Sequence, residues 1–179
     1  TIKYGFELYD NLLVEGVLIP SKKRLTACIS SQVGCSLACT FCATGTLKLE
    51  RNITAAEIYD QVFILNEEAL SNFGKPLTNI VYMGMGEPLL NYAALLKSIS
   101  FITNEEGLNM SPKRITVSTV GVSKMIKKLA DDQVKFNLAI SLHSASDIKR
   151  DLLIPLNKKI NLTELRDALR YFYDQTGTR

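Results

Sequence analysis

Alternating apolar and polar residues predict β-strands in the first 30 residues of the chain. The segment Phe6–Tyr9, the polar pair Asp10–Asn11 and the mostly apolar segment Leu12–Ile19 predict a β-hairpin with its turn at the polar pair. A second polar turn follows, and Leu25–Ser30 then predicts a short apolar strand. The amino-terminal part of the chain is therefore expected to be a hairpin that leads into a further strand.

The remaining chain alternates between helical and strand patterns. Apolar residues recur at helical spacing after Thr54, which forms a capping box with Glu57, so a helix is expected to run to about Leu70. Asn91 and Asn161 are expected to cap two later helices. Apolar runs predict strands at 79–83, 114–118 and 136–141, with further helices at 122–130 and 146–153. Such alternation predicts an α/β fold with a parallel sheet and right-handed crossovers.

Composition bounds the class of protein without naming an activity. The chain has 179 residues, of which 46% are hydrophobic and 22% charged, as expected for one soluble globular domain. A net charge of +3 is too small to indicate nucleic-acid binding by itself, and basic pairs such as Lys149–Arg150 are expected mostly on solvated faces. No apolar run is long enough to span a membrane. The first residue is Thr1, so the sequence is expected to start inside a longer protein.

Three of the four cysteines lie within eight residues. Cys35, Cys39 and Cys42 have the spacing C-x3-C-x2-C, which can bring their thiolates to one soft metal centre. Three ligands are one short of a closed zinc site and one short of a fully ligated iron–sulfur cube. They suit a [4Fe–4S] cluster that leaves one iron open, whereas the competing interpretation is three unrelated thiols. Clustered cysteines without a dispersed disulfide framework also favour a reducing, cytoplasmic compartment.

This cysteine spacing, with Phe41 before the last cysteine, resembles the signature of the radical SAM superfamily. The longer match from Cys28 to Gly45 resembles the RlmN/Cfr family of RNA adenine methyltransferases. The resemblance implies that Cys35, Cys39 and Cys42 hold a [4Fe–4S] cluster whose open iron binds S-adenosylmethionine. It also implies radical methylation of an adenine ring carbon, a centre without nucleophilic character.

A glycine-rich turn follows the strand predicted at 79–83. Two glycines in the segment Gly84-Met-Gly-Glu-Pro88 allow the backbone to approach a ligand closely, although a lone G-x-G is weak evidence. The resemblance implies that Gly86 and Glu87 bind S-adenosylmethionine.

Polar residues also lie at the ends of the last two predicted strands. Ser118 and the segment Ser141-Leu142-His143 occupy positions where ligands bind in parallel α/β proteins. A single histidine at a strand end is more often a satisfied hydrogen-bonding residue than a catalyst. The resemblance implies that Ser118, Ser141, Leu142 and His143 contact S-adenosylmethionine.

Two further residues are candidates for the chemistry itself. Glu15 interrupts an apolar run, so its carboxylate either points outward from an edge strand or faces a site. Cys28 is either a small buried apolar residue or a reactive thiol. The resemblance implies that Glu15 is the general base. It also implies that Cys28 forms a disulfide with a methyl-carrying cysteine, which is not among the four cysteines here.

The resemblance implies a partial (β/α)6 barrel with four barrel strands. Residues 1–24 are expected to form a β-hairpin extension and residues 25–179 the partial barrel. The family's amino-terminal RNA-binding domain and the rest of its barrel are expected to lie outside this sequence. The isolated chain is therefore expected to be inactive.

The function implied is methylation of adenine carbon 2 in 23S rRNA and tRNA. Two alternative functions stay open. One is methylation of adenine carbon 8, as in Cfr, and the other is a non-catalytic iron–sulfur module. The expected partners are the two RNAs and an electron-donor protein such as flavodoxin. The protein is expected to be a cytoplasmic monomer without membrane attachment.

Overall fold

The structure is a computed structural model that describes residues 1–178. Its strands are β1 (Ile2–Glu7), β2 (Leu13–Pro20), β3 (Leu25–Ile29), β4 (Gln32–Val33), β5 (Arg51–Asn52), β6 (Asn79–Tyr82), β7 (Ile115–Thr119) and β8 (Asn137–Ile140). Its α-helices are α1 (Ala55–Phe73), α2 (Tyr92–Thr103), α3 (Ser123–Asp131), α4 (Asp147–Leu153) and α5 (Leu162–Thr176). Short 3-10 helices are η1 (Ala43–Thr46), η2 (Pro88–Asn91), η3 (Pro112–Arg114) and η4 (Pro155–Lys158).

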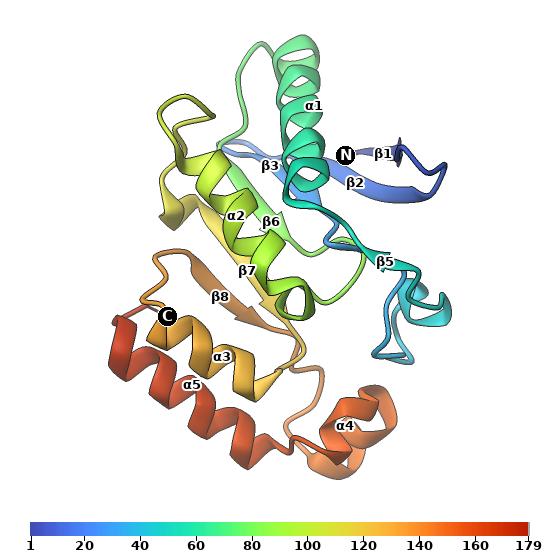
Figure 1. Cartoon of the computed structure of the whole chain (residues 1–179), viewed down its shortest axis with the longest axis vertical. Helices are drawn as coiled ribbons and strands as arrows, with labels where there is room; N and C mark the ends of the chain where they lie inside the picture. The colour runs from blue at the N-terminus through green and yellow to red at the C-terminus, as the bar shows by residue number, and fades with distance from the viewer. Residues whose placement is uncertain (179) are drawn as a thin grey trace.

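Six strands form one mixed sheet in the order β1-β2-β3-β6-β7-β8 (Figure 1). The first three strands pair in antiparallel fashion, and β3, β6, β7 and β8 are parallel. The predicted hairpin, the parallel strands and the α/β class are therefore confirmed. The hairpin continues into the same sheet, and the proposed domain boundary at residue 24 stays a prediction.

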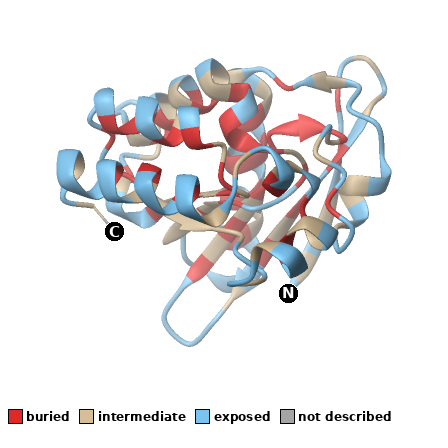
Figure 2. Cartoon of the chain, turned by 90° about the horizontal axis from the view of Figure 1, so that it is seen from below, coloured by how far each residue is buried: buried red, intermediate tan, exposed pale blue. Residues whose placement is uncertain are grey.

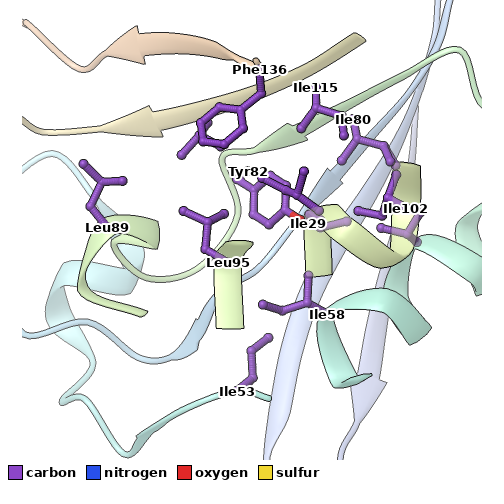
Figure 3. Packing of buried hydrophobic residues seen from close by; sticks show 14 of the residues in the cluster. Ile29, Ile53, Ile58, Ile80, Tyr82, Leu89, Leu95, Ile102, Ile115 and Phe136 are labelled. Carbon is purple, nitrogen blue, oxygen red and sulfur yellow. The ribbon is translucent and has the colours of Figure 1, made fainter. Parts of the chain in front are cut away.

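Helices α1, α2 and α3 pack on one face of the sheet, and α5 lies beside α3 (Figure 1). Buried residues gather where these helices meet the strands (Figure 2). Ile29, Ile80 and Ile115 come from three neighbouring strands and lie close to Leu95 and Ile102 of α2 (Figure 3). Burying each such side chain contributes about 1.5–3 kcal/mol. Strand residues that alternate with the core, such as Cys28, Thr116 and Ser118, point to the opposite face, which we call the open face, and are only half-buried.

The capping box predicted at the start of α1 is confirmed. The Thr54 hydroxyl accepts from the Glu57 N–H at 3.2 Å, and the Glu57 carboxylate accepts from the Thr54 N–H at 2.7 Å. The helix continues to Phe73, slightly beyond the predicted end, and Asn161 caps α5 as predicted by accepting from the Glu164 N–H at 3.0 Å.

The prediction that Asn91 caps α2 is wrong, because its side chain is used elsewhere. The Asn91 amide donates to the main-chain oxygens of Ser31 at 2.8 Å and Ile53 at 2.7 Å. Both bonds are buried, one to the loop after β3 and one to the residue after β5, and buried acceptors need a protein donor. Asn91 therefore fastens two loops rather than a helix end.

The segment Gly45–Asn52, between the cysteine loop and α1, contains local structure. It begins within η1 and ends in β5, which pairs with β4 in antiparallel fashion. Gln32 faces Asn52 and Val33 faces Arg51 across this short ladder. The ladder closes the loop that carries the three clustered cysteines. None of the helices described in residues 1–178 has the length and apolar character needed to cross a membrane.

Two strand glycines, Gly16 on β2 and Gly5 on β1, test how tightly the neighbouring atoms pack around the hairpin. A Cβ atom at Gly16 would lie 2.6 Å from the Phe6 ring and 3.3 Å from the Cys28 carbonyl oxygen, whereas one at Gly5 meets nothing within 4 Å. We expect Gly16→Ala to lower the free energy of unfolding by about 1–3 kcal/mol through overpacking. Gly5→Ala, on the adjoining strand, is the matched control and should have little effect. Urea unfolding followed by circular dichroism measures both; equal effects of the two substitutions would contradict the packing.

Candidate active site

One cavity lies at the carboxyl ends of the parallel strands, beside the cysteine loop. Its volume is about 220 Å³, and it brings together thiols, main-chain groups of the glycine-rich turn and two serine hydroxyls. The predicted site residues that line it are Cys35, Cys39, Cys42, Gly86, Glu87, Ser118 and Ser141. Seven residues predicted from separate parts of the sequence therefore share one cavity.

The cysteine loop is closed by tight local contacts. Gly34 has a φ of 75°, and a Cβ atom there would lie 1.9 Å from the Lys48 carbonyl oxygen, so only glycine fits. The Cys42 N–H donates to the Cys39 carbonyl at 3.1 Å, and the Gly45 N–H donates to the Cys42 carbonyl at 2.9 Å. The loop backbone is thus folded back on itself so that the thiols reach the cavity.

The three thiols are partly withdrawn from water. Burial raises the pKa of Cys39 to about 11, assisted by the neighbouring thiols of Cys35 and Cys42, and burial also raises the pKa of Cys35. Within residues 1–178 no three His, Cys, Asp or Glu side chains converge closely enough to hold a single metal ion. The thiols of Cys35, Cys39 and Cys42 are therefore not arranged to bind one metal ion together. An iron–sulfur cube differs, because each cysteine binds a different iron, and three thiols around a shared cavity fit that donor set.

A buried hydrogen-bonded joint holds the start of the cysteine loop against the glycine-rich turn. The N–H groups of Ser31 and Gln32 donate to the Met85 carbonyl at 2.9 and 3.2 Å. The Glu87 N–H donates to the Gln32 side-chain oxygen at 2.8 Å, and the Gln32 amide donates to Asn52 at 2.7 Å. Gln32 is 1% exposed, so these bonds form away from water. The two loops that border the cavity are therefore fixed relative to each other.

Ser30 extends this joint to the hairpin. Its hydroxyl accepts from the Met85 N–H at 2.8 Å and donates to the Glu15 carbonyl at 2.6 Å. The Ser30 main chain also exchanges two hydrogen bonds with the Gln61 side chain on α1. One fully buried serine thus connects β2, the glycine-rich turn and the first helix.

Glu87 is the buried acid of the cavity, with 3% of its surface exposed. Its carboxylate accepts from the main-chain N–H groups of Leu89 at 3.2 Å and Val120 at 3.0 Å. Burial raises the pKa of Glu87, and these hydrogen bonds oppose that rise. Each carboxylate oxygen retains a lone pair after accepting one bond, so the group can still accept from a ligand donor.

The strand-end residues divide between the cavity and its surroundings. The hydroxyl oxygens of Ser118 and Ser141 lie 3.3 Å apart and both line the cavity. Leu142 instead lines a separate groove beside α5. The His143 ring stacks on Phe41 of the cysteine loop with centroids 3.7 Å apart, and His143 has a φ of 55°. The structure therefore brings two of these four residues into the cavity and places His143 against the cysteine loop.

Glu15 and Cys28 lie on the open face of the sheet, outside the residues that line the cavity. Val17 is opposite Cys28 in the ladder, and Glu15 is two residues from Val17, so all three point to the same face. The Glu15 carboxylate forms an exposed ion pair with Lys3 at 2.6 Å. Burial raises the pKa of the Cys28 thiol. The exposure of Glu15 agrees with the interpretation that its carboxylate points outward. The strand that carries it, β2, lies between β1 and β3 and is therefore not an edge strand.

Sequence reasoning missed two residues that shape this region. Gln32 lies in the cysteine loop with no pattern to indicate its burial. Arg150 was expected in a solvated basic pair, yet it is 1% exposed and donates to the main-chain oxygens of Val120 and Leu142. The sequence gives no signal for the burial of Arg150, because its neighbours Lys149 and Asp151 on α4 are charged.

Arg51 fastens the far side of the cysteine loop. Its guanidinium makes two hydrogen bonds to Asp10 in the hairpin turn, at 2.6 and 3.0 Å, and two to Glu57 at the start of α1, at 2.8 and 3.0 Å. The guanidinium also lies over the Tyr9 ring, 5.1 Å from its centroid. Arg51 thus connects β5 and the nearby start of α1 to the hairpin turn, which lies 41 residues away in sequence.

Comparison with known proteins identifies relatives of the whole chain. The family model for the Radical SAM superfamily matches residues 29–177. A probable dual-specificity RNA methyltransferase RlmN from Flavobacterium psychrophilum is 58% identical over 100% of this chain and 52% of its own length. The corresponding protein from Cytophaga hutchinsonii is 57% identical over 99% of this chain and 49% of its own length. These matches confirm the resemblance inferred from the cysteine spacing.

A solved structure has the same fold. The crystal structure of a radical SAM methyltransferase from Sphaerobacter thermophilus is 43% identical, with a TM-score of 0.95, and the match covers 99% of this chain and 52% of that one. The chain spans about half the length of the relatives that it matches.

The buried joint can be tested through Gln32. Gln32→Ala would leave the buried Glu87 N–H without its acceptor, so we expect a loss of about 1–3 kcal/mol in the free energy of unfolding. We also expect faster hydrogen exchange at the amides of Met85 and Glu87. Gln175→Ala, at an exposed glutamine of α5, is the control. Unchanged exchange at residues 84–87 in Gln32→Ala would contradict the proposed joint.

The Arg51 network predicts a defined pH dependence. Hydrogen bonds from Arg51 hold the pKa values of Glu57 and Asp10 below their ordinary values. Their stabilising effect is therefore complete above the unfolded-state pKa values of about 4 and is lost as the pH falls through the lowered folded-state values. We expect Arg51→Gln to cost about 2 kcal/mol at pH 7 and progressively less in acid.

Urea unfolding of the unsubstituted protein and of Arg51→Gln at neutral and acidic pH measures the difference between their free energies of unfolding. Arg166→Gln is the control, because Arg166 pairs with Asp167 on the surface and such pairs contribute little. A deficit in Arg51→Gln that stays constant down to the lowest pH would show that the carboxylates do not account for it.

Proposed function

The chain belongs to the radical SAM superfamily, and we propose that the protein methylates carbon 2 of adenine in 23S rRNA and tRNA. The observation that supports this most directly is the single cavity shared by three cysteines, the glycine-rich turn and two strand-end serines. A further support is the set of relatives named dual-specificity RNA methyltransferase RlmN, each similar over the whole of this chain.

The residues present fit the cofactors that this activity needs. Cys35, Cys39 and Cys42 would hold three irons of a [4Fe–4S] cluster, since their thiols border one cavity and burial limits access of water. When bound, the cluster and S-adenosylmethionine supply an electron and a carbon-centred radical that can remove hydrogen from a methyl group. Retaining one iron without a cysteine ligand leaves room for the amino and carboxylate groups of the cofactor.

Polar groups of the cavity would orient S-adenosylmethionine. Glu87 retains free lone pairs and lies beside the main chain of Gly86, so it suits a positively charged amino group. The paired hydroxyls of Ser118 and Ser141 can donate to a carboxylate or to ribose oxygens. Leu142 and His143 follow Ser141 directly, and we propose that they complete the cofactor site from the loop after β8.

Glu15 and Cys28 would act on the RNA side of the reaction. We assign Glu15 as the base that takes the adenine ring proton, because its carboxylate is exposed and its partner Lys3 is also on the surface. We assign Cys28 as the thiol that forms a disulfide with the methyl-carrying cysteine and so releases the product. Both residues are on the open face of the sheet, from which an RNA substrate would approach.

The architecture proposed for this activity is a partial (β/α)6 barrel, with β3, β6, β7 and β8 as barrel strands and the hairpin at residues 1–24 as an extension.

Methylation of carbon 8 is disfavoured by the names of the relatives. A non-catalytic iron–sulfur module is disfavoured because electron transfer needs neither Glu87 nor the serine pair. We further propose an electron-donor protein such as flavodoxin as partner, and a monomer located in the cytoplasm.

The test is methylation of an RNA fragment by the full-length protein carrying its reconstituted cluster, with S-adenosylmethionine and a reductant. Mass spectrometry of the digested RNA should find 2-methyladenosine, and 8-methyladenosine in its place would overturn the carbon-2 assignment. Cys28→Ala should retain the cluster but leave RNA attached to the protein, because the release step is lost. Cys35→Ala should lose both the cluster and all activity. A Cys28→Ala protein with normal turnover would contradict the assigned role.

A further inference from the structure

A buried arginine lies behind the wall of the cysteine-lined cavity. Arg150, on α4, is 1% exposed. Its guanidinium donates to the main-chain oxygens of Leu142 and Val120 and to the side-chain oxygen of Asn157. Arginine is not deprotonated in proteins, so these contacts hold a fixed positive charge inside the fold.

The charge of Arg150 has no carboxylate directly against it. The ion pairs within 4.0 Å that involve residues 1–178 do not include Arg150. Two carboxylates are connected to Arg150 indirectly, through Asn157. The Asn157 amide donates to Asp147 at 2.9 Å and to Asp151 at 2.6 Å. A buried charge with only neutral acceptors is costly, unless another negative group nearby compensates it.

The helix that carries Arg150 is attached to the cysteine loop. The Thr40 N–H donates to the Leu153 carbonyl at 3.0 Å, and the Thr40 hydroxyl donates to the Leu152 carbonyl at 3.2 Å. Thr40 directly follows Cys39, and Val120, an acceptor of Arg150, lines the cavity together with Cys39. The guanidinium of Arg150 therefore lies directly behind a main-chain carbonyl of the cavity that the three thiols border.

We propose that Arg150 raises the reduction potential of the cluster held by Cys35, Cys39 and Cys42, by stabilising its more negative, reduced form. This inference depends on the proposed function, because it requires the cluster. Reduction transfers one electron from an external donor to the cluster and breaks no bond, so the cluster gains one negative charge. A fixed cation in a region of low dielectric stabilises that added charge more strongly than a solvated cation would. Local charge is one of the established influences on iron–sulfur potentials.

Two substitutions of opposite sign test the inference. In the full-length protein with a reconstituted cluster, Arg150→Gln should shift the midpoint potential to a more negative value, and Arg150→Lys should restore much of the loss. Asp151→Asn should shift it to a more positive value, because it removes a negative charge while leaving an oxygen for Asn157. Arg166→Gln changes net charge by the same amount at an exposed position and should have no effect. An anaerobic redox titration with dithionite, followed by EPR of the reduced cluster, measures each potential.

The outcomes separate the inference from the function on which it depends. A full iron and sulfide content with the same potential in Arg150→Gln as in the unsubstituted protein would overturn the role of Arg150. If Arg150→Gln does not fold, Asp151→Asn decides, and a potential that is unchanged or more negative overturns the proposal. An unsubstituted protein that takes up no iron and sulfide would overturn the proposed function itself, and the inference with it, before any titration.

Discussion

The cysteine loop and the glycine-rich turn are joined by hydrogen bonds that are shielded from water. The Met85 carbonyl accepts from the N–H groups of Ser31 and Gln32, and the N–H groups of Met85 and Glu87 donate to the side-chain oxygens of Ser30 and Gln32. Buried polar groups without partners destabilise a protein by about 1–3 kcal/mol each, and no buried side-chain nitrogen or oxygen among residues 1–178 lacks one. The relative position of the two loops is therefore strongly determined, and every property of the cavity depends on it.

The sheet topology explains why this joint lies where it does. Parallel strands β3 and β6 are neighbours although about fifty residues separate them, so the loops that leave their carboxyl ends start side by side. The next strand, β7, brings the loop around Val120 to Glu87, and β8 brings Ser141 to Ser118. One sheet edge thus collects groups from four sequence segments, and the buried joint then fixes their spacing.

Local patterns were sufficient to predict most of the elements and much of the cavity. The capping box at Thr54 and the apolar strands depend on near neighbours in sequence, and the cysteine spacing is itself a local motif. Asn91 was misassigned because a helix cap and a long-range donor have the same sequence appearance. The Asn91 side chain donates to the carbonyls of Ser31 and Ile53 instead of capping α2, and the positions of these carbonyls are determined only in the folded chain.

Arg150 shows the same limit more strongly, since α4 reverses the usual rule for an amphipathic helix. Ile148 and Leu152 are 80% and 72% exposed, whereas the arginine between them is 1% exposed. Helical spacing alone favours the opposite arrangement, with the two apolar side chains inside. The arginine is buried where its guanidinium donates to the main-chain oxygens of Val120 and Leu142, which lie just after the ends of the parallel strands β7 and β8. Main-chain carbonyls after these strand ends lie beside the cavity, so a buried arginine that donates several hydrogen bonds to them also places its positive charge near the cavity.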